Sequence, residues 1–96
     1  ASASPELARA IDEARKTGIL FVVAAGNGGQ DGVGDDNDRV PTYPAAYTHD
    51  NVVTVAATDR SDNLTRFSNW GARTVHVGAP GEGILSTQNG GRYQTM

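Results

Sequence analysis

The sequence contains no cysteine, so it can form neither disulfide bonds nor cysteine-based metal sites. It also lacks any apolar run near the roughly 20 residues that an α-helix needs to cross a membrane. Lys and Arg number eight against eleven Asp and Glu, and they form no cluster or basic helix face. We therefore expect neither a nucleic-acid partner nor a membrane partner.

The start of the chain, Ala1-Ser2-Ala3-Ser4, has neither the basic residues nor the apolar stretch of a signal peptide. At 96 residues the chain has room for about one small domain. Twelve glycines stand against one tryptophan, three tyrosines and two phenylalanines. This composition favours a loop-rich fold with tight turns and a thin core.

A helix is predicted over residues 5–17. Ser4 can cap its first amides, and Pro5 suits the first helical position. Apolar residues recur at helical spacing, and Asp12 and Lys16 can pair on the outer face. Gly18 is a natural residue to end the helix.

Three strands and a hairpin are predicted after the helix. Residues 19–25 are continuously apolar, as in a central parallel strand that is covered on both faces. Further strands are expected over 52–57 and 74–77, and Asn89-Gly90 indicates a hairpin between 84–86 and 92–94. The polar, glycine-rich residues 28–42 suggest a surface loop. A strand that is apolar on both faces needs two covering layers, yet only one helix is available, so the chain is expected to be part of a larger α/β domain.

One segment carries a candidate for chemistry. Asn27 stands between Gly26 and Gly28, directly after the first predicted strand. Sites in open α/β sheets lie at the carboxyl ends of strands, and a rigidly held amide can donate a hydrogen bond to a developing oxyanion. A plain Asn-Gly turn is the alternative interpretation of the same residues.

Five short segments, in the same order, resemble subtilisin-like serine proteases (subtilases). They are Phe21 to Asn27, Tyr43-Pro44-Ala45, Val52 to Thr58, Phe67-Ser68-Asn69-Trp70-Gly71, and Ala79-Pro80-Gly81 followed by Ile84-Leu85-Ser86-Thr87. With these segments in register, the resemblance extends over about residues 19–96. The resemblance implies an α/β fold, with the chain forming a fragment of a doubly wound, mainly parallel sheet.

The resemblance also implies roles for individual residues. Asn27 matches the side-chain donor of the oxyanion hole. Ala24, Ala25 and Gly26 match one wall of the pocket for the residue before the scissile bond, and Thr42, Tyr43 and Pro44 match its base and far wall. A cis peptide bond is expected between Tyr43 and Pro44. The small alanines and the neutral Thr42 predict a preference for apolar or unbranched side chains.

In this family the catalytic Asp and His precede the Ala-Gly-Asn strand, and the nucleophile lies in a Gly-Thr-Ser-Met-Ala motif after the hairpin. None of these is found in residues 1–96, so the chain is expected to be a partial catalytic domain that is inactive alone and prone to self-association. The resemblance implies a secreted or extracytoplasmic endopeptidase that acts on protein or peptide substrates and needs no cofactor for catalysis. The alternative is a catalytically dead homologue that binds proteins in the retained groove.

Other residues admit rival interpretations. His49 and His76 could be offered as a general base, but neither lies in a motif with a serine, so surface or sheet positions are favoured. The acidic residues between Asp31 and Asp38 do not have EF-hand spacing, and a solvated loop is favoured over a metal site. The family resemblance allows a structural calcium on carbonyls near Ala45 and Tyr47, although His76 replaces a carboxylate that some members add.

Two further motifs are weaker. The glycines at 26, 28 and 29 do not form a nucleotide-binding Gly-x-Gly-x-x-Gly, because an acidic loop follows them instead of a helix. Asn63-Leu64-Thr65 is an N-glycosylation sequon, which would be used only in a eukaryotic secretory setting.

Overall fold

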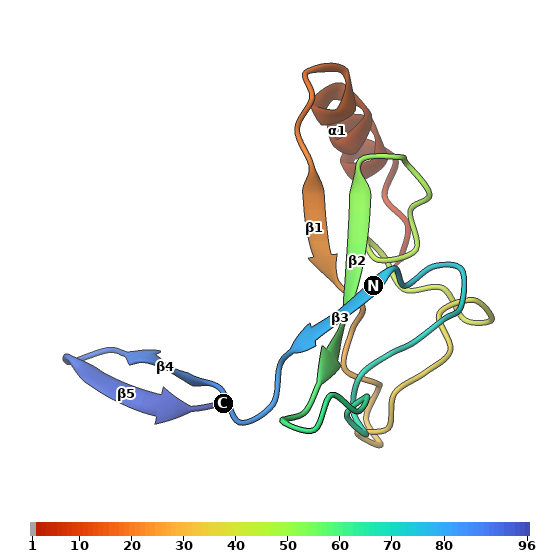
Figure 1. Cartoon of the computed structure of the whole chain (residues 1–96). Coiled ribbons are helices and arrows are strands. Elements are labelled where there is room, and N and C mark those ends of the chain that lie inside the picture. The colour runs from red at the N-terminus through yellow and green to blue at the C-terminus, as the bar shows by residue number, and fades with distance from the viewer. Residues whose placement is uncertain (1) are drawn as a thin grey trace.

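The structure, a computed structural model, describes residues 2–96 as one helix, a three-stranded parallel sheet and a separate hairpin (Figure 1). The elements in chain order are α1 (Pro5–Lys16), β1 (Phe21–Ala24), β2 (Val52–Thr58), β3 (Val77–Pro80), β4 (Leu85–Gln88) and β5 (Arg92–Thr95). The sheet order is β1-β2-β3, and β4 pairs with β5 in the antiparallel sense. The predicted α/β class, the helix and the hairpin are confirmed.

Both ends of α1 follow from local sequence. The Ser4 hydroxyl accepts a hydrogen bond from the Leu7 amide, and Pro5 occupies the first turn. At the other end, Gly18 adopts φ +77°, and the amides of Gly18 and Ile19 close onto carbonyls of the last turn. This arrangement satisfies backbone groups that a helix end otherwise leaves unpaired, so the helix stops at Lys16.

The parallel register places alternate residues of β1 and β2 on the two faces of the sheet. Phe21 pairs with Val52 and Val23 with Thr54, so these four side chains share one face. The predicted first strand, 19–25, is longer than the observed β1. Its first residues are engaged elsewhere, since the Ile19 amide belongs to the helix cap and its carbonyl accepts from Asn51.

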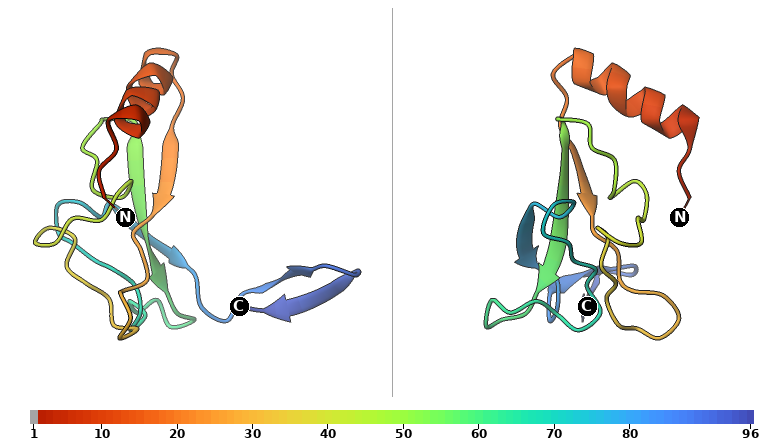
Figure 2. Two further views of the ribbon diagram at one scale, coloured as in Figure 1. Left: turned by 180° about the vertical axis from the view of Figure 1, so that it is seen from behind. Right: turned by 90° about the vertical axis from the view of Figure 1, so that its right-hand side faces the viewer.

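The face that carries Thr54 is covered by α1 and by the turn around residues 43–47 (Figure 2). The Tyr47 hydroxyl both donates to the Ser4 carbonyl and accepts from its amide, each at 2.8 Å, which ties the turn to the start of α1. The Thr54 hydroxyl donates to the Ala45 carbonyl, also at 2.8 Å, and Thr54 is fully buried. Polar side chains thus fasten loops to a small core that includes Ile11.

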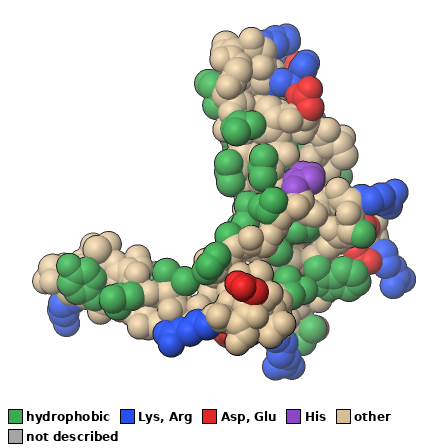
Figure 3. Space-filling model, viewed as in Figure 1, with side chains coloured by type: hydrophobic (Ala, Val, Ile, Leu, Met, Phe, Trp, Pro, Cys, Tyr) green, Lys and Arg blue, Asp and Glu red, His purple; other side chains and the backbone are tan. Residues whose placement is uncertain are grey.

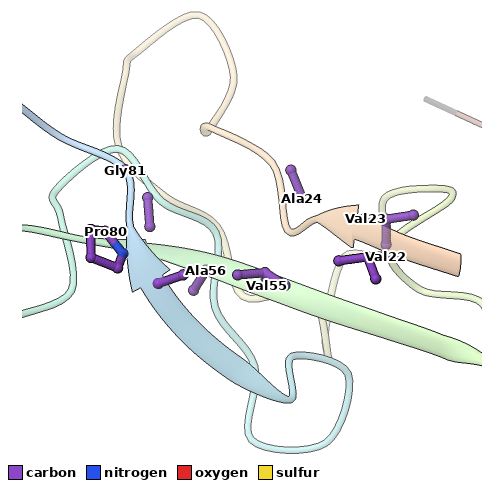
Figure 4. A pocket seen from close by; sticks show the side chains of 9 residues that line it. Val22, Val23, Ala24, Val55, Ala56, Pro80 and Gly81 are labelled. Atoms are coloured by element: carbon purple, nitrogen blue, oxygen red, sulfur yellow. The ribbon is translucent and has the colours of Figure 1, made fainter. Parts of the chain in front are cut away.

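The opposite face is open, as the shortage of helices predicted. Leu20 and Val22 are 65% and 66% exposed, and Figure 3 shows hydrophobic side chains along this part of the molecule. A shallow apolar cavity of about 310 Å³ lies on the sheet (Figure 4). Its lining comes from all three strands and includes Val22, Ala24, Val55, Ala57, Ala79 and Pro80.

The third strand is displaced from its predicted position at 74–77 to Val77–Pro80. The reason is His76, whose amide donates to the Thr54 carbonyl while its ring Nδ1 accepts from the Thr54 amide, both at 2.9 Å. The ring thereby takes the place of a backbone partner, and regular pairing begins only at Val77 opposite Val55. Pro80 is tolerated because β3 is an edge strand of the described sheet.

Candidate functional site

Asn27 lies just beyond the carboxyl end of β1, the location that its sequence position predicted. The flanking Gly26 and Gly28 adopt φ +111° and +71°, a region that side chains other than hydrogen rarely allow. The Asn27 side chain is exposed, and no hydrogen bond to it is found within residues 2–96. Its amide is therefore available to an external acceptor.

The turn that carries Asn27 is held from both sides by Asn69. The Asn69 amide donates to the Gly26 carbonyl at 2.8 Å, and the Gly28 amide donates to the Asn69 Oδ1 at 2.9 Å. A Cβ on Gly26 would lie 2.6 Å from the Asn69 Nδ2, so only glycine fits there without displacing this side chain. The Phe-Ser-Asn-Trp-Gly segment thus holds the turn around Asn27, and its Asn69 lies 41 residues after Gly28 in the sequence.

Asn37 completes the arrangement behind Asn69. The Asn69 Nδ2 donates to the Asn37 Oδ1 at 3.1 Å, and the Asn37 Nδ2 donates to the Ala25 carbonyl at 2.9 Å. Asn37 and Asn69 are 1% and 3% exposed, and Asp35 donates its amide to the same Asn69 Oδ1. The prediction that residues 28–42 form a surface loop is therefore wrong for Asn37. No local pattern indicates its burial, because its partners lie far away in the sequence.

The expected wall residues are attached to neighbouring positions of β2. The Ala25 amide donates to the Val55 carbonyl at 2.8 Å, and the turn after Thr42 is held to the adjacent Thr54 through Ala45. Ala25 is 1% exposed, while the side chain of Ala24 lies on the open face, where it lines the shallow cavity. The two alanines consequently present their side chains to opposite sides of the sheet.

The second wall, Thr42 to Pro44, forms a half-buried turn. Its Tyr43–Pro44 peptide bond is cis, as the resemblance predicted. The Ala46 amide donates to the Thr42 carbonyl at 2.8 Å and closes the turn. The ring of Tyr43 lies 4.7 Å from that of Tyr47, so aromatic packing links this turn to the residue that anchors α1.

Neither histidine is placed for acid–base catalysis within residues 2–96. His76 uses its Nδ1 to accept the Thr54 amide, and the ring of His49 packs edge-on against Tyr47 with a centroid distance of 5.6 Å. Both histidines thus have structural partners. Among the hydrogen bonds of residues 2–96, neither histidine side chain is bonded to a serine, as a general base would be.

Asp38 differs from the solvated loop residue that the sequence suggested. Its carboxylate accepts from the Thr74 hydroxyl at 2.7 Å and from the amides of Arg73 and Thr74. These bonds, the one from the Thr74 hydroxyl first, hold the pKa of Asp38 below its usual value. The carboxylate therefore acts as an anchor between two loops.

Within residues 2–96 no cluster of three or more acidic, histidine or cysteine side chains could hold a metal ion. The Ala45 carbonyl, one of the expected calcium ligands, already accepts a hydrogen bond from Thr54, and Ala45 is only 2% exposed. A structural calcium ion in the complete protein stays a prediction. In the described part of the chain, no helix has both the length and the apolar character needed to cross a membrane.

Comparison with known proteins matches residues 1–96 to the Subtilase family, and the chain belongs to that family. Cerevisin from Saccharomyces cerevisiae is 45% identical over 91% of the chain, which corresponds to 12% of that protein. The major intracellular serine protease of Bacillus subtilis is 40% identical over 93% of the chain and 26% of that protein. Thermitase from Thermoactinomyces vulgaris is 38% identical over 94% of the chain and 28% of that protein.

The chain spans only about 5% to 32% of the length of the curated relatives it matches. Its relatives are named as proteases, and the resemblance inferred from five short motifs is confirmed. The expectation of a secreted or extracytoplasmic protein stays a prediction, because one relative is named an intracellular protease.

Proposed function

We propose that this chain is part of a serine endopeptidase that cleaves protein substrates through an acyl-enzyme. In such a reaction a serine attacks the scissile carbonyl, a histidine moves the proton, and an aspartate orients the histidine. These three groups would come from parts of the protein outside residues 1–96. The chain itself would supply the oxyanion donor and two walls of the substrate pocket, and would be inactive alone.

The observation that carries this proposal is the placement of Asn27. A hydrogen-bond donor for an oxyanion must be rigid and must point where negative charge develops. Asn27 lies at the carboxyl end of a parallel strand, its side chain is exposed, and the peptide groups on both sides of it are hydrogen-bonded. Membership of a family of proteases supports the same role.

The proposed pocket walls are Ala24, Ala25 and Gly26 on one side and Thr42, Tyr43 and Pro44 on the other. Both segments are fastened to consecutive residues of β2, Thr54 and Val55, so movement of one relative to the other is restricted. None of the six wall residues carries a charge. A peptide with an apolar or unbranched side chain before the scissile bond is the substrate class that this chemistry suits.

The test is kinetic and uses the complete protein expressed from its full reading frame. Asn27→Ala should lower kcat on a peptide substrate by about 10²–10³ with little change in KM, a magnitude taken from a member of this same family. Asn63→Ala is the matched control, because Asn63 is exposed and lies in the turn after β2. Its kinetics should equal those of the wild type.

Two results would count against the proposal. Unchanged kcat in Asn27→Ala would remove the oxyanion role. Sequencing the reading frame beyond Met96 gives the second, since a frame without a serine in a Gly-Thr-Ser-Met-Ala setting would favour the catalytically dead, protein-binding alternative.

A further inference from the structure

We infer that Asn69 is the positioning residue for Asn27, and that Asn37 fixes Asn69 in turn. The inference rests on the oxyanion role proposed for Asn27, which it extends to residues that never touch substrate. Asn69 lies in the Phe-Ser-Asn-Trp-Gly segment, 41 residues after the Gly28 amide that it binds.

The two peptide groups on either side of Asn27 have the same partner. The carbonyl of Gly26 accepts from the Asn69 main-chain amide at 2.8 Å. The amide of Gly28 donates to the Asn69 side-chain oxygen at 2.9 Å. With the backbone fixed on both sides, the direction of the Asn27 Cα–Cβ bond is fixed as well.

The turn needs such an external restraint. Glycine populates positive and negative φ about equally, so a Gly-Asn-Gly sequence has little conformational preference of its own. A mobile oxyanion donor stabilises the transition state poorly, since misplacement of a catalytic group by about 1 Å can lower the rate about 10²-fold. The sequence around Asn27 therefore allows the tight turn, and Asn69 selects one geometry for it.

Asn69 can act as a rigid clamp because its own side chain has a single satisfied orientation. Its Oδ1 accepts from the main-chain amides of Gly28 and Asp35, and its Nδ2 donates to the Asn37 Oδ1. The Asn37 Nδ2 in turn donates to the Ala25 carbonyl. Both asparagines are at least nine-tenths buried. Flipping either amide would set oxygen against oxygen inside the protein, which is costly where water cannot compensate.

These bonds form a closed ring. It runs from Ala25 through Asn37 and Asn69 to Gly28 and returns along the main chain past Asn27. A residue that only joined two loops would have no reason to bind both neighbours of the candidate catalytic residue. The ring therefore predicts that substitutions at Asn69 act on turnover through Asn27.

A double-mutant cycle in the complete protein tests this coupling. The variants are Asn69→Ala, Asn27→Ala and the two combined, with enzyme concentrations set by titration with an irreversible serine-directed inhibitor. Asn69→Ala should lower kcat by at least about tenfold and by no more than the oxyanion donor itself contributes, about 10²–10³, with KM nearly unchanged. In the Asn27→Ala background the same change should alter kcat by less than about twofold, the usual scatter of independent effects.

Asn51→Ala is the matched control. Asn51 is also a buried asparagine, but it donates to the carbonyls of Ile11 and Ile19, at the end of the sheet that carries α1. It should lower stability without changing kcat of the folded enzyme. If Asn69→Ala yields no folded protein, Asn37→Ala is used in its place, because it leaves both Asn69 bonds around Asn27 intact and should give a smaller loss that also vanishes without Asn27.

A second measurement does not depend on activity. Hydrogen exchange of the amides of Gly28 and Asp35 should accelerate in Asn69→Ala by more than its loss of global stability accounts for, because this variant loses their shared acceptor. In Asn51→Ala it should accelerate by no more than the loss of global stability accounts for. Unchanged exchange at Gly28, or a loss of kcat in Asn69→Ala that persists in full in the Asn27→Ala background, overturns the inference. If Asn27→Ala keeps its activity, the oxyanion proposal fails, and the exchange result alone decides whether Asn69 holds the turn.

Discussion

Replacing Gly34 by alanine would drive a methyl group into the backbone of Ser68. The added Cβ would overlap the Ser68 carbonyl oxygen and lie 2.5 Å from its carbonyl carbon. The obstacle is main chain, so no side-chain rotation can relieve it. The loop of residues 28–42 would have to move away from the Phe-Ser-Asn-Trp-Gly segment.

The cost can be worked out from the bonds that this movement breaks. The Gly34 amide donates to the Arg66 carbonyl at 2.8 Å, and the adjacent Asp35 amide donates to Asn69 at 2.9 Å. Two hydrogen bonds at about 1 kcal/mol each, with about 1–3 kcal/mol for an overpacked contact, give a destabilisation of about 3–5 kcal/mol.

Alanine substitutions at two other glycines of this loop separate the destabilisation caused by a steric clash from that caused by an unfavourable φ. A methyl group added at Gly29 would meet open space, and the φ of Gly29 is not positive, so Gly29→Ala should be neutral or stabilising by up to about 1 kcal/mol. Gly32 has the same open space but φ +67°, so Gly32→Ala should cost about 1–2 kcal/mol from backbone strain alone.

The assay is urea unfolding of the complete protein carrying each substitution. Unfolding is followed by the fluorescence of Trp70, whose main-chain amide donates to the Asp35 carbonyl beside the contact between Gly34 and Ser68. The expected order of stability is Gly29→Ala, then Gly32→Ala, then Gly34→Ala. Equal stabilities for the last two would refute the reasoning, because the clash at Ser68 would then contribute nothing.

Acid stability, substrate preference and self-association offer further tests. The pKa of Asp38 is depressed in the folded state. Its contribution to the free energy of unfolding is therefore complete above the ordinary carboxyl pKa of 3.8 and is lost as the pH falls through the lower folded value. The urea midpoint should drop below about pH 4, and Asp38→Asn should flatten this pH dependence. Peptide-library profiling of the complete protein should favour apolar or unbranched residues before the scissile bond, and dominance of acidic or basic residues there would contradict the proposed pocket. The 96-residue chain expressed alone should self-associate through its open sheet face, where Leu20 and Val22 are about two-thirds exposed, and a monodisperse, cooperatively folding monomer in sedimentation and thermal melts would argue against this.

Elements with local signals could be predicted closely. The helix carries its own cap at Ser4 and its own stop at Gly18, so its bounds differ from the prediction by one residue. The strand predicted at 52–57 is equally clear, because its run of valines, alanines and Thr54 has no Gly or Pro, and the observed strand extends it by one residue to Thr58. In both cases the information lies within a few residues of the element.

The predictions are wrong where a hydrogen bond to a residue distant in the sequence overrides the structure that the local pattern favours. Val75 and Val77 alternate around His76 as strand residues do, but the His76 ring bonds to Thr54 and delays the strand. Asn37 stands in an acidic, glycine-rich stretch that looks solvated, and its burial depends on Asn69 and Ala25. Similarity to a family located Asn27, whereas the contacts that hold it required the structure.

The separation of 41 residues between Gly28 and Asn69 also sets an order of events during folding. The hairpin β4–β5 closes within a few residues and can form early, whereas the turn at Asn27 acquires its shape only after a long loop has closed. During synthesis the asparagine emerges from the ribosome well before the residue that clamps it. A nascent or partly folded chain in which Asn69 has not yet bound Gly26 and Gly28 would therefore hold Asn27 without a fixed orientation.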